Sequence, residues 1–140
     1  MCDGGYLDHA EIMVLRAEPV RCLIVDDSPD FLAAAATFLE QDGFTVVGVA
    51  STIAETLRSA EILRPNVMLV DVYLGGESGF DLAEQLHRGG CCPRSAVILT
   101  STHNLQDFAE MVATSPAVGF LPKMALSPGA IRELLAAPEA

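Results

Sequence analysis

Side chains that can bind a metal ion or a phosphoryl group stand where short apolar runs of this sequence end. They are three carboxylates, one hydroxyl and one ammonium group: Asp26, Asp27, Asp71, Thr100 and Lys123. Carboxylates that lie close together raise one another's pKa and need a nearby cation to stay ionised. Mg²⁺ supplies such a charge and commonly binds through one or two carboxylates together with phosphate oxygens and water. These residue types predict a Mg²⁺ site if the fold brings them together.

Asp71 has the chemistry of a nucleophile toward phosphorus, because a carboxylate can attack a phosphoryl group and form an aspartyl phosphate. The cation and the ammonium group of Lys123 would neutralise the charge on the oxygens of that group, which is the main task in phosphoryl transfer. The hydroxyl of Thr100 can donate a hydrogen bond to one of the same oxygens. The set therefore predicts transfer of a partner's phosphoryl group to Asp71.

Each of these residues has an ordinary structural interpretation when it is taken alone. An Asp-Asp pair before Ser28 and Pro29 is typical of a turn that leads into a helix. A Thr at the end of a strand and a single Lys near the C-terminus are common in any domain. The functional interpretation depends on the combination, because every one of these residues stands at an end of an apolar run and none interrupts a strand core.

The elements that must position these residues alternate from Arg21 to the end of the chain. Apolar runs of four to six residues, rich in β-branched side chains, predict buried strands at Cys22–Val25, Thr45–Ala50, Val67–Val72, Ala96–Thr100 and Val118–Leu121. Caps, apolar spacing of 3.6 residues and helix-ending glycines or prolines predict the helices. These cover residues 29–43, 52–64, 80–88 and 105–114, with a last short helix after Ser127 and Pro128.

Five strands that alternate with five helices predict an α/β fold with a parallel sheet and helices on both faces. In such a doubly wound sheet, ligands bind beyond the carboxyl ends of the strands. The polar residues named above all stand at those ends, so we expect them to lie along one edge of the sheet.

Composition sets limits on the class of protein. The chain has 140 residues, of which 51% are hydrophobic, and a net charge of −11; this suits one domain with a sizeable core. Its eight basic residues are scattered, so it lacks the clustered Lys and Arg of a nucleic-acid footprint. No apolar run approaches the roughly 20 residues that span a bilayer, and the N-terminus lacks a signal-peptide pattern. We expect a cytoplasmic protein.

Two parts of the chain fall outside the pattern. Residues 1–19 contain no helix cap and only a weak apolar cluster, so we expect a mobile lead-in before a domain at residues 20–140. Cys91 and Cys92 are adjacent but form no CxxC pair with any other cysteine. We expect reduced thiols at the edge of a loop, with metal binding or oxidation as the alternative.

Four segments resemble the receiver domain of two-component response regulators. They are LIVDDSP at 23–29, VMLVDVYLGGESGFDLA at 67–83, VILTS at 97–101 and GFLPK at 119–123, and the resemblance covers about residues 20–137. It implies the flavodoxin-like (βα)₅ sandwich with strand order 2-1-3-4-5. It also implies a signalling phosphoacceptor, which catalyses only its own phosphorylation and dephosphorylation, and not an enzyme with a separate substrate.

Carried over residue by residue, the resemblance makes Asp71 the acceptor of a phosphoryl group from the phosphohistidine of a sensor histidine kinase. It implies Mg²⁺ ligands at Asp27 and Asp71, a partly water-mediated one at Asp26, and a further one at the backbone carbonyl of Tyr73. Thr100 and Lys123 would contact the phosphoryl oxygens. Two further roles follow: Phe120 stands where the family keeps an aromatic residue that swings inward as the Thr moves, and Ser101 is small enough to leave a path to the acyl phosphate.

The sequence departs from the family pattern at several positions. Gly75 stands where many members have Pro, so we expect a more mobile loop there. Pro122 precedes Lys123 and Met124 follows it, so the family's common cis Lys-Pro bond is unavailable. Tyr73 is bulky at a position that flanks the phosphoryl group. We expect its ring to shield the phosphorylated Asp71 from water.

The resemblance also implies an output surface, formed by Leu105–Thr114, Gly119–Leu121 and Pro128–Leu135, which phosphorylation would switch for partner binding or dimerisation. Contact with DNA would be indirect, through an output domain that is absent from this chain, and no membrane partner is expected. The main alternative is a pseudo-receiver, which binds partners without phosphorylation but usually lacks an acidic or Lys position. An aspartate-based phosphatase would need a second Asp where Tyr73 stands, and a flavodoxin would need a phosphate loop where Asp26, Asp27 and Asp30 repel phosphate.

Overall fold

A five-stranded parallel sheet forms the centre of the molecule. The computed structural model describes residues 20–89, 95–103 and 105–136. The sheet has the order β2-β1-β3-β6-β7, and every neighbouring pair is parallel. Its strands are β1 (Arg21–Val25), β2 (Thr45–Ala50), β3 (Val67–Asp71), β6 (Ala96–Ser101) and β7 (Gly119–Pro122). This confirms the predicted order 2-1-3-4-5, since β6 and β7 are the fourth and fifth strands of the sheet.

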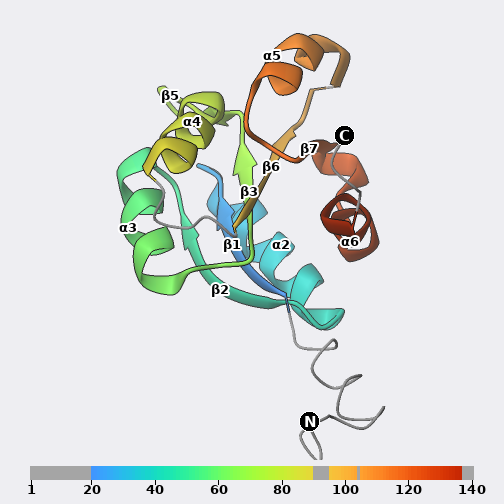
Figure 1. The fold of residues 1–140 in the computed structure, drawn as a ribbon. Coiled ribbons are helices and arrows are strands. Elements are labelled where there is room, and N and C mark those ends of the chain that lie inside the picture. Colours follow the sequence, from blue (N-terminus) through green and yellow to red (C-terminus); the bar gives the residue numbers. More distant parts are fainter. Residues whose placement is uncertain (1–19, 90–94, 104, 137–140) are drawn as a thin grey trace, which may run out of the picture.

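Helices cover both faces of this sheet (Figure 1). They are α2 (Pro29–Gln41), α3 (Ile53–Leu63), α4 (Gly79–Gly89), α5 (Ala109–Thr114) and α6 (Pro128–Ala136). Successive strand side chains point to opposite faces, and two separate apolar cores result. Leu23 and Val25 pack in the core under α3, α4 and α5, whereas Cys22 and Ile24 pack in the core under α2 and α6. Burial on both faces explains why the central strands are continuous apolar runs.

Side-chain caps begin the predicted helices. Ser28 Oγ accepts a hydrogen bond from Phe31 N at 3.2 Å at the start of α2. Thr52 Oγ1 accepts one from Glu55 N at 3.1 Å at the start of α3. These bonds satisfy backbone donors that have no partner within the first turn of a helix. The Glu55 carboxylate accepts the amide of Ser51 at 2.8 Å, and this bond lowers the pKa of Glu55, as does a weaker one from the backbone of Thr52.

The helix predicted at 105–114 is not continuous. A 3₁₀ turn, η1 (Leu105–Asp107), is followed by Phe108 with φ −128° and ψ 6°, and only then by α5. Phe108 is 8% exposed, and its ring packs 6.0 Å from the ring of Phe80. Phe108 is therefore buried but outside helical geometry, although its spacing in the sequence fits a helix. A second 3₁₀ turn, η2 (Lys123–Ala125), follows β7.

A small hairpin follows β3 and was not predicted. Its antiparallel strands are β4 (Tyr73–Leu74) and β5 (Glu77–Ser78), joined by Gly75 and Gly76. Gly75 has φ +63°, and two-residue hairpin turns of type II′ place Gly at this first position because it must have positive φ. Pro, fixed near φ −65°, cannot adopt that conformation. The departure from the family pattern at Gly75 is thus explained by a hairpin in place of the expected loop.

Some predictions lie outside the described residues. These are the lead-in at 1–19 and the pair Cys91 and Cys92. Among the residues that are described, none of the helices has the length and apolar character needed to cross a membrane.

Candidate functional site

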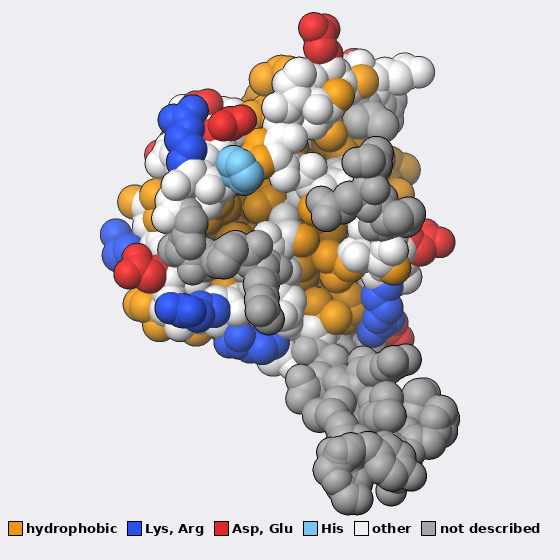
Figure 2. Space-filling view, in the orientation of Figure 1, with side chains coloured by type: hydrophobic (Ala, Val, Ile, Leu, Met, Phe, Trp, Pro, Cys, Tyr) orange, Lys and Arg blue, Asp and Glu red, His pale blue; other side chains and the backbone are white. Residues whose placement is uncertain are grey.

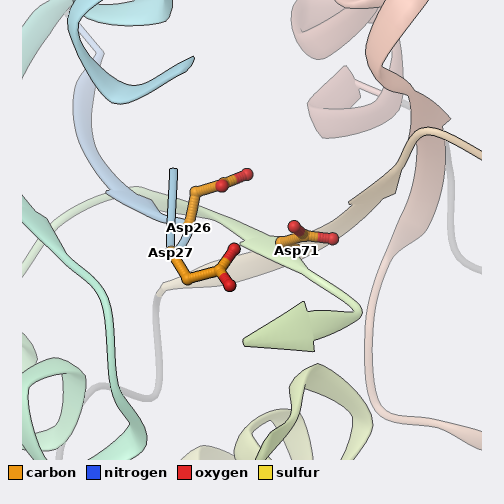
Figure 3. A group of neighbouring side chains, drawn as sticks. All are labelled: Asp26, Asp27 and Asp71. Carbon is orange, nitrogen blue, oxygen red and sulfur yellow. The ribbon is translucent and has the colours of Figure 1, made fainter. Parts of the chain in front are cut away.

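Three carboxylates converge beyond the ends of β1 and β3. Asp26 and Asp27 directly follow β1, and Asp71 is the last residue of β3, which is the neighbour of β1 in the sheet. One oxygen from each lies within 4.8 Å of the others, and Figure 3 shows the three side chains gathered at this edge. Asp26 is fully buried and Asp71 is 6% exposed, whereas Asp27 faces solvent. The cluster is therefore open to solvent mainly at Asp27.

Lys123 reaches this cluster from the loop after β7. Its Nζ lies 2.6 Å from Asp26 Oδ2 and 3.2 Å from Asp71 Oδ2. The same ammonium group lies 4.3 Å from the centroid of the Phe31 ring, and cations are attracted to the face of an aromatic ring. Hydrogen bonds and charges of Asp26 and Asp71 outweigh the burial of this side chain and raise the pKa of Lys123. Lys123 is therefore held as a cation between two carboxylates.

The carboxyl group of Asp71 is held in an environment that disfavours its charge. Burial raises the pKa of Asp71, and the charge of Asp26 adds to the rise. The Tyr73 amide, which donates to Asp71 Oδ1 at 3.2 Å, and Lys123 act in the opposite direction without cancelling it. One ammonium group thus does not compensate three carboxylates, and a further cation would stabilise the ionised form.

Thr100, Ser101 and Phe120 lie on the two strands beyond Asp71. Thr100 is paired with Asp71 in the sheet register and is 1% exposed. Ser101 is fully buried, and its Oγ accepts the His103 amide at 3.0 Å. Phe120 is paired with Leu99 and is 9% exposed, so its ring is packed in the core in this structure. Thr100 is placed beside the acceptor on the neighbouring strand, and Phe120 lies one strand further along the sheet.

Tyr73 connects the acceptor to an aromatic cluster. Its backbone N–H donates a hydrogen bond to Asp71 Oδ1, while its side chain is 55% exposed. The ring makes edge contacts with His103, at a centroid distance of 5.8 Å, and with Phe108, at 5.9 Å. Phe108 in turn lies 6.0 Å from Phe120. Stacked or edge-on rings at such distances attract one another, so the loop after β3 is tied to the strand that carries Phe120.

Sequence reasoning assigned no site role to Phe31, Gly79 or His103. Phe31 lies in the first turn of α2, and its ring faces the ammonium group of Lys123. Gly79 sits so close to β3 that a Cβ atom there would lie 2.2 Å from the backbone oxygen of Asp71. His103 packs on Tyr73. Of these three residues, only Gly79 could have been recognised from the sequence, because it is a glycine at the start of a predicted helix and lies within a family motif.

A divalent metal ion fits the residues that the structure brings together. Asp26 is fully buried, and its Oδ2 lies 2.6 Å from the ammonium group of Lys123. Lys123 brings one positive charge to three neighbouring carboxylates, so a divalent cation would complete the neutralisation of the cluster. The donor set is all oxygen, which suits Mg²⁺.

The raised pKa of Asp71 predicts a specific pH dependence of stability in the metal-free protein. The folded chain holds the Asp71 proton more tightly than the unfolded chain does, so this group stabilises the fold at low pH. That contribution is lost as the pH rises from about 4 through the raised pKa. In EDTA, we expect the free energy of unfolding of the wild type to fall with rising pH relative to that of Asp71→Asn. Urea unfolding at several pH values measures the difference, and a difference independent of pH would contradict it.

The sequence of this chain is similar to a known family of domains and to curated proteins. A family model described as the response regulator receiver domain matches residues 22–136. The uncharacterized transcriptional regulatory protein YvfU of Bacillus subtilis is 30% identical over 105 residues, which are 74% of this chain and 52% of that protein. The chain spans about half the length of the first curated relatives that it matches.

Solved structures share the fold. A CheY-like response regulator receiver domain protein from Methanospirillum hungatei superposes with a TM-score of 0.69 at 26% identity, covering 84% of this chain and 90% of the other. A response regulator from Burkholderia pseudomallei, solved with a phosphorylated aspartic acid, calcium and citrate, has a TM-score of 0.72 at 24% identity. The superposition covers 84% of this chain and 66% of the Burkholderia chain.

Proposed function

The chain belongs to the response regulator receiver domain family, and from that premise we propose that it accepts a phosphoryl group on Asp71 from the phosphohistidine of a sensor histidine kinase. The observation that carries the proposal is the approach of Asp26, Asp27, Asp71 and Lys123 at one edge of the sheet. Receiver domains are signalling domains, and this one would act as a switch in the cytoplasm.

In the proposed reaction, an oxygen of the Asp71 carboxylate attacks phosphorus while the bond from phosphorus to the histidine nitrogen breaks. The nitrogen keeps the electron pair of that bond, and the product is an acyl phosphate on Asp71. The ammonium group of Lys123 already lies 3.2 Å from Asp71 Oδ2. After transfer it would pair with the negatively charged oxygens of the phosphoryl group. The Thr100 hydroxyl, on the neighbouring strand, would donate to another of them.

Asp26, Asp27, Asp71 and the backbone carbonyl of Tyr73 are the groups that would hold Mg²⁺. Bound there, Mg²⁺ would neutralise charge on the oxygens of the transferred group. Within this set, Asp26 is buried against Lys123, and Asp27 is the exposed member. We therefore propose that Asp27 and Asp71 bind the ion directly and that Asp26 binds it partly through water.

Incubation with acetyl phosphate and Mg²⁺, followed by measurement of the intact mass, tests the proposal. We expect a species heavier by about 80 Da, the mass that one phosphoryl group adds, and we expect EDTA to abolish it. Absence of this species at any Mg²⁺ concentration would contradict the proposal. It would favour the alternative, a pseudo-receiver that binds its partners without phosphorylation.

Replacement of Tyr73 by Asn should shorten the life of the phosphorylated state. The Tyr73 ring is half exposed beside the acceptor and braced by His103 and Phe108, so it would exclude water from the acyl phosphate. We expect Tyr73→Asn to hydrolyse several times faster than the wild type, on the order of 10-fold, when decay of the phosphorylated mass is timed. Tyr73→Phe keeps the ring and should decay at the wild-type rate. An unchanged or slower decay in Tyr73→Asn would contradict the shielding role.

We also propose that phosphorylation changes the surface formed by α5, β7 and α6, through Thr100 and Phe120, and that a partner or a second copy of the chain binds there. Light scattering with and without beryllofluoride measures dimerisation, and an identical mass in both would count against it. The YvfU relative is named as a transcriptional regulator; for this chain, any effect on DNA would be indirect.

A further inference from the structure

A pocket lies beside the phosphoacceptor edge and has no role in the reaction proposed above. Its volume is about 540 Å³, within the range of about 300–1,000 Å³ that binding pockets occupy. The β4–β5 hairpin forms one wall, and the start of α4, Ile53 of α3, and Phe108 and Met111 at the start of α5 form the others. Residues that line it include Tyr73, Glu77, Phe80, Asp81, Phe108 and Met111.

Large apolar side chains in this pocket are partly exposed to water. Tyr73 is 55% exposed and Met111 is 51% exposed, and both stand at the rim around the more buried rings of Phe80 and Phe108. An apolar surface with a polar rim is typical of a protein-binding site. A partner's apolar side chain placed here would bury the exposed parts of Tyr73 and Met111, which is the kind of contact that contributes most to binding.

The charged residues that line the pocket are both acidic. They are Glu77 and Asp81, and the segment 105–118, which carries Phe108 and Met111, also contains Asp107 and Glu110 but no Lys or Arg. On the face shown in Figure 2, an acidic side chain projects at the top over α5, and no described Lys or Arg lies there. Opposite charge on a partner would favour association. A second copy of this chain, with a net charge of −11, is therefore a less favourable occupant of this acidic pocket than a basic segment.

The pocket shares residues with the acceptor site. Tyr73 holds Asp71 Oδ1 through its backbone N–H, at 3.2 Å, while its ring lines the pocket. Phe108 also lines the pocket and lies 6.0 Å from the ring of Phe120. A phosphoryl group on Asp71 would compete with the bond from Tyr73 N, so it would alter one wall of the pocket. Coupling of this kind works equally in both directions.

We propose that this pocket is a docking site for a basic amphipathic segment of a partner protein. The segment seats an apolar side chain against Phe108 and Met111 and places Arg or Lys beside Glu77 and Asp81. Phosphorylation of Asp71 changes the affinity of the pocket, and this part of the inference rests on the proposed function.

A labelled peptide tests the docking site on the full chain. The probe is a synthetic helical peptide with Leu on one face and Arg on the other, and fluorescence anisotropy measures its Kd with Mg²⁺ present. Met111→Asp and Asp81→Lys alter exposed residues at the pocket, so the fold should survive both, as circular dichroism can verify. We expect each to weaken binding by at least about five-fold.

Matched controls separate docking from general charge attraction. Met124→Asp changes a methionine that is 96% exposed and lies on η2, and Glu133→Lys reverses an exposed charge on α6. Both should leave the Kd within about two-fold of the wild-type value. Equal weakening in pocket variants and controls would overturn the docking site, as would equal binding of a peptide with Glu in place of Arg.

Addition of beryllofluoride tests the coupling. We expect the Kd of the peptide to change by at least about five-fold, within the usual range of coupling between two sites, and an identical Kd would overturn the coupling. Acetyl phosphate labelling of the same preparation reports on Asp71 alone. A chain that is labelled but does not bind the peptide would refute the docking site and leave the proposed function intact.

Discussion

Asp71→Asn should abolish phosphorylation by acetyl phosphate, leaving only the unmodified mass. The amide nitrogen and oxygen of Asn are much weaker nucleophiles than a carboxylate, and Asn cannot form the acyl phosphate. The substitution keeps the size of the side chain, and the acceptor lies at the end of a strand whose other residues are fully buried. We therefore expect a folded protein in which labelling falls below the limit of detection by intact mass.

Asp107→Asn is the matched control for this variant. Asp107 lies on η1 and is exposed, so the same chemical change should leave labelling at the wild-type level. Labelling that persists in Asp71→Asn would place the acceptor elsewhere, and peptide mapping of the modified chain would identify it. Asp26 and Asp27 would be the residues to examine first, because their oxygens lie within 4.8 Å of Asp71.

Among the glycines that the structure describes, Gly79 should be the one whose replacement by Ala destabilises the protein most. A Cβ atom at Gly79 would lie 2.2 Å from the backbone oxygen of Asp71 and 2.9 Å from the Cα atom of Val72. These are backbone atoms that cannot rotate away, and the amide of Gly79 is bonded to the carbonyl of Val72 at 2.9 Å. We expect a loss of about 3 kcal/mol in the free energy of unfolding, the upper end of the usual cost of overpacking.

Urea unfolding of Gly79→Ala beside Gly76→Ala measures this effect. No atom lies within 4 Å of the position that a Cβ would take at Gly76, so its substitution should change stability by less than about 0.5 kcal/mol. Because the clash at Gly79 involves the Asp71 backbone, labelling by acetyl phosphate should also slow in Gly79→Ala. Equal stabilities of the two variants would show that α4 can shift away from β3.

The sheet could be predicted because the residues of each buried strand show their burial in the sequence of that strand alone. The runs at 22–25 and 67–72 are continuous and apolar, as strands buried on both faces must be, and parallel strands place their carboxyl ends at the same edge. The positions of Asp26, Asp27, Asp71, Thr100 and Lys123 at the ends of these runs therefore predict that they lie along one edge of the sheet.

Contacts between side chains could not be predicted in the same way. Nothing in the sequence shows that Lys123 reaches both Asp26 and Asp71, because that depends on how the loop after β7 packs on Phe31. The β4–β5 hairpin has two residues in each strand, too few for any periodic pattern. Phe108 fits helical spacing, yet it stands between η1 and α5, with its ring packed against those of Tyr73, Phe80 and Phe120. In each case the deciding interaction is tertiary.

The ammonium group that offsets the carboxylates comes from the last strand connection of the domain. Lys123 is 52 positions beyond Asp71 in the chain, and it lies after all the strands that bring the acids together. During synthesis, β1, β3 and β6 leave the ribosome before Lys123 does. Until then, a nascent chain that paired these strands would hold three carboxylates without their internal cation. The repulsion among them disfavours early closure of the sheet, so the domain is expected to fold late, once nearly all of its sequence has been made.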